Sequence, residues 1–239
     1  MKSNFDFLDN EFPVLAQFGK RAELYLYSDS NSCLMKLGMI GETVVNLMFT
    51  YDRITLPAEN TAVNRIAVLF REGLLTQDLV DILHALRKVR NKAVHENYAS
   101  VVDGKVLLQM AHSLCEWFMQ TYSDWNYKNK PFVLPANLPV EVSTDTGAEQ
   151  EHEKQLSKEA EEKAAASDSV AKEKRRQQAA KAASQRQKTE AETRYMIDQQ
   201  LRQVGWEADT ENLRFSKGTR PVKGRNLAIA EWPTDSTVG

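Results

Sequence analysis

The sequence predicts a mainly α-helical protein with an N-terminal helical bundle, a charged helical spacer and a short C-terminal segment. Apolar residues between positions 34 and 118 recur at steps of three and four, which is the period of a helix that buries one face. From residue 141 to residue 194 there is no Phe, Trp or Tyr, so this stretch lacks the side chains that usually build a core. The bundle is therefore expected first and the spacer after it.

The composition is that of a chain with one or two domains. The 239 residues are 42% apolar and 27% charged, with a formal net charge of -2. A mean hydropathy of -0.51 indicates that one part is much more polar than the rest. No apolar run is long enough to span a membrane and no secretory signal begins the chain, so we expect a cytoplasmic protein without membrane contact. Cys33 and Cys115 lie far apart among apolar residues, which indicates buried thiols and no metal site.

Four amphipathic helices are expected in residues 1–140. Their apolar positions are Leu34, Leu37, Ile40, Val44 and Met48, then Val63, Ile66, Ala67 and Phe70, then Leu79, Ile82, Leu83 and Leu86, and finally Leu107, Met110, Leu114, Trp117 and Phe118. Thr76 is the expected N-cap of the third helix. Pro131, Pro135 and Pro139 forbid a regular continuation, so this domain should end near residue 140.

The expected spacer covers residues 141–192. It is rich in residues that favour helix, yet no apolar heptad recurs, so a cooperative coiled coil is not specified. Glutamates dominate its first half, and lysines and arginines its second half. We expect a solvated, partly helical spacer, and the alternative is an arm that makes acidic and basic contacts.

Residues 193–239 begin with a short amphipathic helix that should stop at Gly205, a suitable C-terminal cap. A basic stretch and a short apolar run, residues 227–232, follow before Pro233. One helix and little else are too few to close a core. This segment is therefore expected to be the start of a larger domain.

The basic stretch supplies candidate contacts to DNA phosphates. It contains five cations with no acid between them, and Phe215 lies within it: Arg214, Lys217, Arg220, Lys223 and Arg225. Lysine and arginine displace condensed counterions from DNA, so phosphate contact is one interpretation. A solvated loop is the other.

Arg90 and His95 have the R-x4-H spacing that resembles HEPN-type helical domains, some of which are metal-independent ribonucleases and many of which are inert scaffolds. In such a ribonuclease the His would act as general acid or base and the Arg would stabilise charge on the scissile phosphate. Five helical residues turn through about 140°, so a composite site in a homodimer would be needed. The structural alternative is a buried Arg90 paired with Glu42, and a His95 that stabilises the helix end.

Five segments resemble the restriction subunit of type I restriction-modification enzymes. RYMIDQQLRQVGW (194–206), LRFSKGTRP (213–221) and AIAEWP (228–233) resemble the opening of its nuclease domain. SNFDFL (3–8) and LRKVRNKAVHE (86–96) resemble the helical domain that precedes the nuclease in one branch of the family. The resemblance implies a HEPN-like helical domain in 1–140, the spacer in 141–192, and in 193–239 the incomplete start of an α/β restriction-nuclease domain.

The resemblance also implies a function in DNA restriction, with modification and specificity subunits and DNA as partners. The full-length family uses Mg²⁺ in a D…ExK nuclease core and ATP in a P-loop motor. Neither motif is present in a convincing context here, so the resemblance implies no cofactor and no complete catalytic site in this chain. Two alternatives remain open: a free-standing HEPN-like ribonuclease that uses Arg90 and His95, and a pure protein-docking module.

Overall fold

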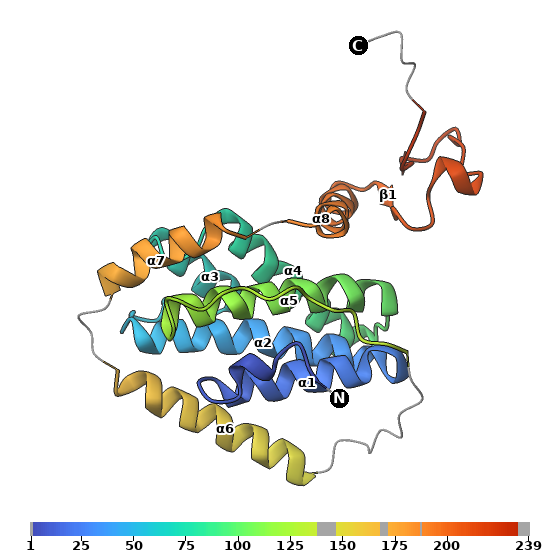
Figure 1. Cartoon of the computed structure of the whole chain (residues 1–239). Helices are drawn as coiled ribbons and strands as arrows, with labels where there is room; N and C mark the ends of the chain where they lie inside the picture. The colour runs from blue at the N-terminus through green and yellow to red at the C-terminus, as the bar shows by residue number, and fades with distance from the viewer. Residues whose placement is uncertain (1, 138–146, 168–171, 187, 234–239) are drawn as a thin grey trace. The chain divides into compact units, whose positions relative to one another are not determined.

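The structure is a computed structural model that describes residues 2–137, 147–167, 172–186 and 188–233. The chain forms two compact units, Met1–Arg186 and Gln187–Gly239 (Figure 1). Helices account for most of the described residues, which confirms the predicted mainly α fold.

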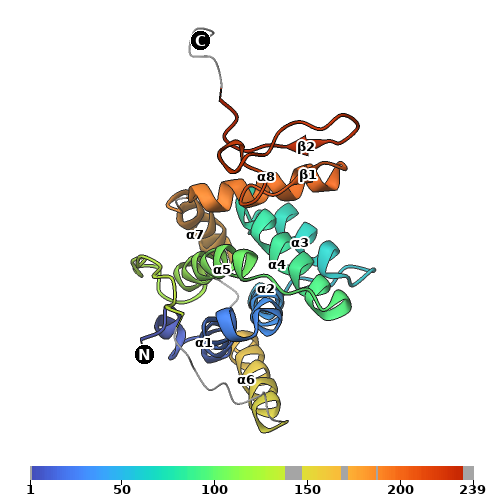
Figure 2. The ribbon, with the colours of Figure 1, turned by 90° about the vertical axis from the view of Figure 1, so that its right-hand side faces the viewer.

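The first unit is a helical bundle built around α2. After a short 3-10 turn, Asp6–Leu8, come α1 (Pro13–Ser28), α2 (Ser30–Tyr51), α3 (Ala62–Arg71), α4 (Gln77–Glu96) and α5 (Val101–Tyr122). Helix α2 contacts all four of the others, and α1 and α4 lie along opposite sides of it (Figure 2). Four of these helices were expected, and α1 was not.

The core of the bundle is closed by large aromatic and aliphatic side chains. Those that are fully buried include Trp117, Phe5, Phe12, Phe18, Phe118, Leu15, Leu34 and Ile40. Both thiols are buried, as predicted, and burial raises the pKa of Cys33 to about 12. Within the described residues α2 is long and apolar enough to cross a membrane, but two-thirds of its most apolar stretch is buried in the bundle, so the core accounts for its composition.

Two local predictions about the helices are corrected. Helix α3 buries Ile66 and Leu69, while Val63 and Phe70, which were expected inside, are 43% and 44% exposed. Of the positions predicted to face inward only Ile66 is buried, and Leu69 takes the inward place that was assigned to Phe70. Thr76 does occupy the N-cap of α4, but its hydroxyl makes no capping hydrogen bond.

The proline-containing segment after α5 is irregular, as predicted, over residues 125–137, and Pro139 lies outside the described residues. Its backbone is held to the bundle by side chains. The Tyr27 hydroxyl donates to the Pro135 carbonyl at 3.0 Å, and the Glu116 carboxylate accepts from the Lys130 N–H at 2.6 Å. This segment therefore lies along the bundle and ends its helical run.

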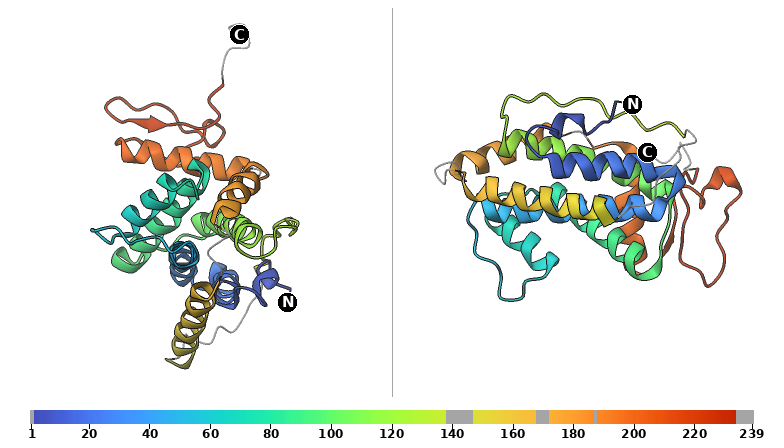
Figure 3. Two further views of the ribbon diagram at one scale, coloured as in Figure 1. Left: turned by 90° about the vertical axis from the view of Figure 1, so that its left-hand side faces the viewer. Right: turned by 90° about the horizontal axis from the view of Figure 1, so that it is seen from below.

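The predicted solvated spacer is corrected by the structure. Its helices α6 (Gly147–Ala165) and α7 (Lys172–Ser184) pack against the bundle, α6 on α1 and α2, and α7 on α5 (Figure 3). Small alanines allow the close approach, and Ala160, Ala164, Ala179 and Ala182 are buried. The compact units divide at residues 186 and 187, not near residue 140.

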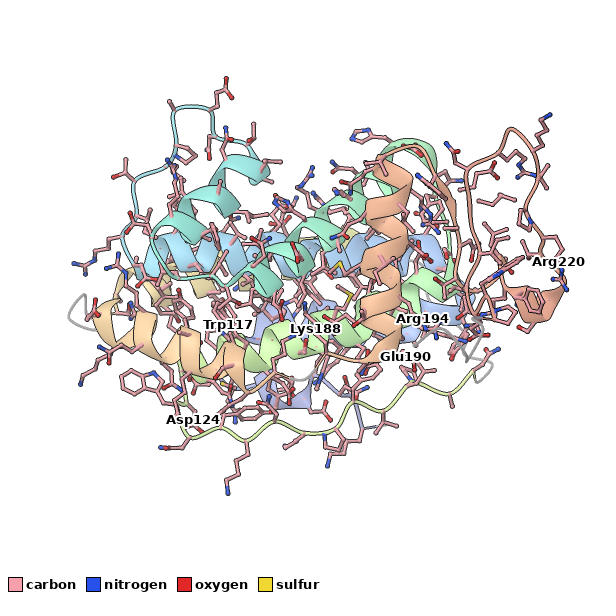
Figure 4. The ribbon with its side chains drawn as sticks, turned by 90° about the horizontal axis from the view of Figure 1, so that it is seen from above. Trp117, Asp124, Lys188, Glu190, Arg194 and Arg220 are labelled. Carbon is pink, nitrogen blue, oxygen red and sulfur yellow. The ribbon has the colours of Figure 1, made fainter. Side chains whose placement is uncertain are left out.

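Each spacer helix carries one buried charge that is paired with the bundle. Glu153 of α6 accepts two hydrogen bonds from Lys36 of α2, at 2.8 and 2.9 Å, and both side chains are less than 8% exposed. Arg175 of α7 donates to Asp52 at 3.0 Å, and both are buried. Trp117 of α5 donates its indole N–H to the Ala179 carbonyl of α7 (Figure 4). The helical character of the spacer was predicted, but its packing on the bundle was not, because these buried ion pairs replace the large apolar side chains that usually indicate a core. The alternative of an arm with acidic and basic contacts agrees with them.

The second unit contains α8 (Glu190–Gln203), β1 (Glu207–Ala208), a 3-10 turn, Phe215–Lys217, and β2 (Leu227–Ala228). The two short strands are parallel, with Glu207 opposite Leu227. Gly205 has a φ of +83°, so it ends the helical region as predicted. Glu190 and Arg194 form an ion pair on successive turns of α8 (Figure 4).

Candidate functional site

Arg90 lies on α4 and pairs with the carboxylate predicted for it. Its Nη1 is 2.9 Å from Oε2 of Glu42 on α2. The two side chains are 38% and 51% exposed, so the predicted burial of the pair is wrong. The head group reaches solvent because only the aliphatic stem of Arg90 is held between the helices.

That stem lies directly against the backbone of α2 at Gly38. A Cβ atom added to Gly38 would lie 2.2 Å from Cβ of Arg90 and 2.5 Å from its Cδ. Such contacts require the two helices to move apart. Arg90 therefore has a packing role at the α2–α4 contact in addition to its ion pair.

Gly38→Ala is expected to destabilise the bundle by about 1 to 3 kcal/mol, because the new methyl group overpacks the α2–α4 contact. Gly41→Ala is the matched control on the same helix, since its Cβ would lie 3.4 Å from the nearest atom of Leu86. Urea unfolding of the two variants measures the difference. Equal stability of the two would contradict the close contact at Gly38.

His95 lies in the last turn of α4 and is exposed. The helix ends after it at Asn97, which is in the left-handed conformation. Arg90 and His95 are five residues apart on one helix, so they diverge by about 140° around its axis. The ribonuclease role of these residues stays a prediction.

Arg90→Ala is expected to cost less than a buried ion pair would. The exposed pair with Glu42 contributes up to about 1 kcal/mol, and loss of the stem contacts adds to that cost. His95→Ala should change stability by less than about 0.5 kcal/mol, because its side chain is exposed. If the motif is structural, the unmodified chain does not cleave single-stranded RNA. Cleavage that both substitutions abolish, with unchanged thermal unfolding, would instead establish a ribonuclease.

The three arginines among the five residues predicted to contact DNA phosphates interact with other residues of the second unit. Arg214 pairs with Glu231 at 3.0 Å and donates to the Thr210 carbonyl. Arg225 forms a two-fold hydrogen-bonded pair with Glu207 of β1. The Arg220 guanidinium stacks 3.9 Å from the centre of the Phe215 ring. These arginines hold the loop in place.

Lys217 and Lys223 are the exposed remainder of that stretch. Neither forms an ion pair with any described residue. The cations of the basic stretch therefore divide into three arginines with structural partners and two free lysines. Phosphate contact remains a prediction for all five.

Comparison with known proteins places this architecture in a family. Residues 20–165, from α1 to the end of α6, match a family described as a domain of unknown function, DUF4145. The chain belongs to the DUF4145 family. The DUF4145 match includes α6, which agrees with the packing of that helix on the bundle.

Residues 207–239 match a second family, described as the second domain of the type I restriction enzyme EcoKI endonuclease subunit. The chain is also 32% identical, over 98% of its length, to the EcoKI endonuclease subunit of Escherichia coli strain K12. It spans 24% of that subunit's length. These matches confirm the resemblance to the restriction subunit of type I enzymes. No solved structure matches significantly.

The described part of this DUF4145 chain offers no fitting site for the magnesium of a nuclease. No group of three or more His, Cys, Asp or Glu is placed there to hold a metal ion. The sequence reasoning missed a different polar cluster, His112 and Glu116, which is buried beneath the N-terminal segment. Their spacing of four residues on α5 was the available signal.

Proposed function

We propose that this chain forms the N-terminal part of the restriction subunit of a type I restriction-modification enzyme and serves DNA restriction in the cytoplasm. The observation that carries the proposal is the succession of matches, a DUF4145 bundle followed by the start of the second domain of an endonuclease subunit. The near-complete coverage of the chain by one such subunit supports the same order of domains.

The proposed partners are the modification and specificity subunits and DNA. Magnesium and ATP belong to the complete subunit in this proposal, and no step is assigned to them in the described residues. The bundle and its two spacer helices would then bind the other subunits of the complex. The site of DNA recognition would lie in one of those other subunits.

Co-expression with the modification and specificity subunits of the same host tests the proposal. The tagged chain is expected to elute with both subunits in size-exclusion chromatography, at a mass that light scattering assigns to the complex. Elution of the chain by itself, as monomer or homodimer, in the presence of both subunits would contradict the proposal. The homodimer would in that case favour the ribonuclease alternative.

A further inference from the structure

The solvent side of α4 carries a row of polar and basic side chains, which we name the α4 basic stripe. It consists of His84, Arg87, Lys88, Asn91, Lys92 and His95. Steps of three and one residues place all six within a sector of about 140° and along about 16 Å of the helix axis. The sector lies opposite the buried residues Leu79, Leu83, Leu86 and Val89.

The stripe is open to solvent at its C-terminal end. Asn91, Lys92 and His95 are exposed, and Arg87 and Lys88 are of intermediate exposure. Nε of Arg87 and Nδ1 of His84 are buried atoms without a hydrogen-bond partner among the described residues. The part of the stripe that is open to a ligand is therefore the exposed side chains of Asn91, Lys92 and His95, with Arg87 and Lys88 half-buried beside them.

The cations of the stripe lack ion-pair partners in the described part of the chain. Arg87, Lys88 and Lys92 form no ion pair with any residue that the structure describes. Asp81 and Glu96 flank the stripe at its two ends, and Asp81 instead accepts a hydrogen bond from Gln77 at 2.8 Å. Lys92 does rest 5.6 Å from the centre of the Tyr98 ring. The positive charge of the stripe is therefore compensated only in part, by the Coulomb attraction of Asp81 for Lys88 and His84.

This arrangement costs stability in the free protein. Like charges four residues apart, such as Lys88 and Lys92, destabilise a helix. Burial lowers the pKa of Lys88, and the positive charges of Arg87 and Lys92 lower it further, against the opposing attraction of Asp81. A polyanion placed across the stripe would relieve this repulsion.

We propose that the α4 basic stripe binds the phosphodiester backbone of duplex DNA. A duplex carries one phosphate per about 3.4 Å of axis on each strand, so the length of the stripe matches about five phosphates of one strand. Lysine and arginine contacts of this kind give affinity without reading sequence. Such contacts suit a subunit whose target site is chosen elsewhere in the enzyme.

The chemistry of the stripe favours a nucleic acid over a protein or a membrane. A protein interface has an apolar centre that is depleted in lysine, whereas the stripe has no apolar residue from His84 to His95 within its sector. A membrane-bound amphipathic helix inserts its apolar face, but the apolar face of α4 is buried in the bundle. Protein–DNA interfaces are polar and positively charged. The choice of DNA over RNA rests on the proposed function.

Fluorescence anisotropy with a labelled DNA duplex tests the proposal on the full chain. Replacing Arg87, Lys88 and Lys92 together by Gln is expected to weaken binding at least about tenfold and to reduce the salt slope of log K by about two to three, since each phosphate contact contributes about one. The matched control replaces Lys154, Lys158 and Lys181 by Gln, which removes the same charge from exposed positions on α6 and α7. The control should bind as the unmodified chain does.

Four outcomes would overturn the proposal: no duplex binding, equal loss in both triple variants, tighter binding to single-stranded RNA, or tighter binding to vesicles of anionic lipid. Circular dichroism and thermal unfolding must be unchanged in the stripe variant, and single substitutions replace it if they are not. The co-elution experiment is run on the same variant. Assembly of this variant with weakened duplex binding is the expected result. Assembly of the unmodified chain without any duplex binding contradicts only the stripe proposal, whereas failed assembly of the unmodified chain contradicts the proposed function.

Discussion

Arg175→Ala is expected to lower the free energy of unfolding by roughly 3 to 5 kcal/mol, because it leaves a buried carboxylate without its charged partner. Asp52 is fully buried in its side chain, and its two oxygens accept from Arg175 at 3.0 Å and from the Tyr122 hydroxyl at 2.7 Å. Arg175 also lies over the rings of Tyr51 and Tyr122. Its removal opens the contact between α7 and the bundle. Urea unfolding, followed by circular dichroism, measures the loss.

Lys181→Ala is the matched control, since it removes one positive charge from an exposed position of the same helix. It should change stability by no more than about 0.5 kcal/mol. The double variant Arg175→Met with Asp52→Leu should recover much of the loss, because neither charge is then buried alone. A small effect of Arg175→Ala would show that α7 does not hold this position on the bundle in solution.

The same helix shows what the sequence could and could not predict. Helical periodicity located α2, α4 and α5, since each buries a regular apolar face in the core. The period also runs through Val14, Phe18, Ala22 and Leu26, and Pro13 stands at the first turn of α1, so the missed helix carried a readable signal. The packing of α7 on the bundle carried no such signal, because it combines small buried alanines with a buried arginine whose partner is 123 residues away.

In the candidate site, the sequence could suggest a partner for Arg90 but not the exposure of the pair. Glu42 was named as a candidate partner of Arg90 because Arg90 continues the apolar stripe of its helix and would need a carboxylate, and the structure places the two groups 2.9 Å apart. Their exposure was not predictable, since it depends on how closely Gly38 lets the helices approach. In the second unit, the pairing of Arg214 with Glu231 requires the return of the chain past β2, which no local pattern specifies.

The buried pair of His112 and Glu116 should make the free energy of unfolding depend on pH, and single substitutions in the pair would reveal that dependence. Burial raises the pKa of Glu116 from 4.5 to about 7 and lowers the pKa of His112 from 6.5 to about 4. His112 lies among the rings of Phe5, Phe7 and Phe132, and its Nδ1 is 3.7 Å from Oε2 of Glu116. Both groups are therefore neutral in the folded protein over much of the interval between these values.

The two groups act on stability in opposite directions. The folded pKa of Glu116 is raised, so its stabilisation is complete below about pH 4.5 and about 3 kcal/mol is lost as the pH rises through about 7. The folded pKa of His112 is lowered, so its stabilisation is complete above about pH 6.5 and a similar amount is lost as the pH falls through about 4. In the unmodified chain the two contributions to the slope of unfolding free energy against pH have opposite signs and largely cancel.

Glu116→Gln removes the contribution of Glu116 to the pH dependence of stability and leaves that of His112. Gln resembles the protonated carboxyl and keeps an oxygen for the Lys130 N–H, which donates to Glu116 at 2.6 Å. The variant should exceed the unmodified chain in stability by about 3 kcal/mol near pH 8 and match it near pH 4. Urea unfolding across this range measures the difference, with the exposed Glu96→Gln as control. A constant difference at every pH would mean that folding does not shift the pKa of Glu116. The carboxyl would then be ionised in the folded protein above about pH 4.5, and the segment after α5 would be held by a charge and not by a neutral acid.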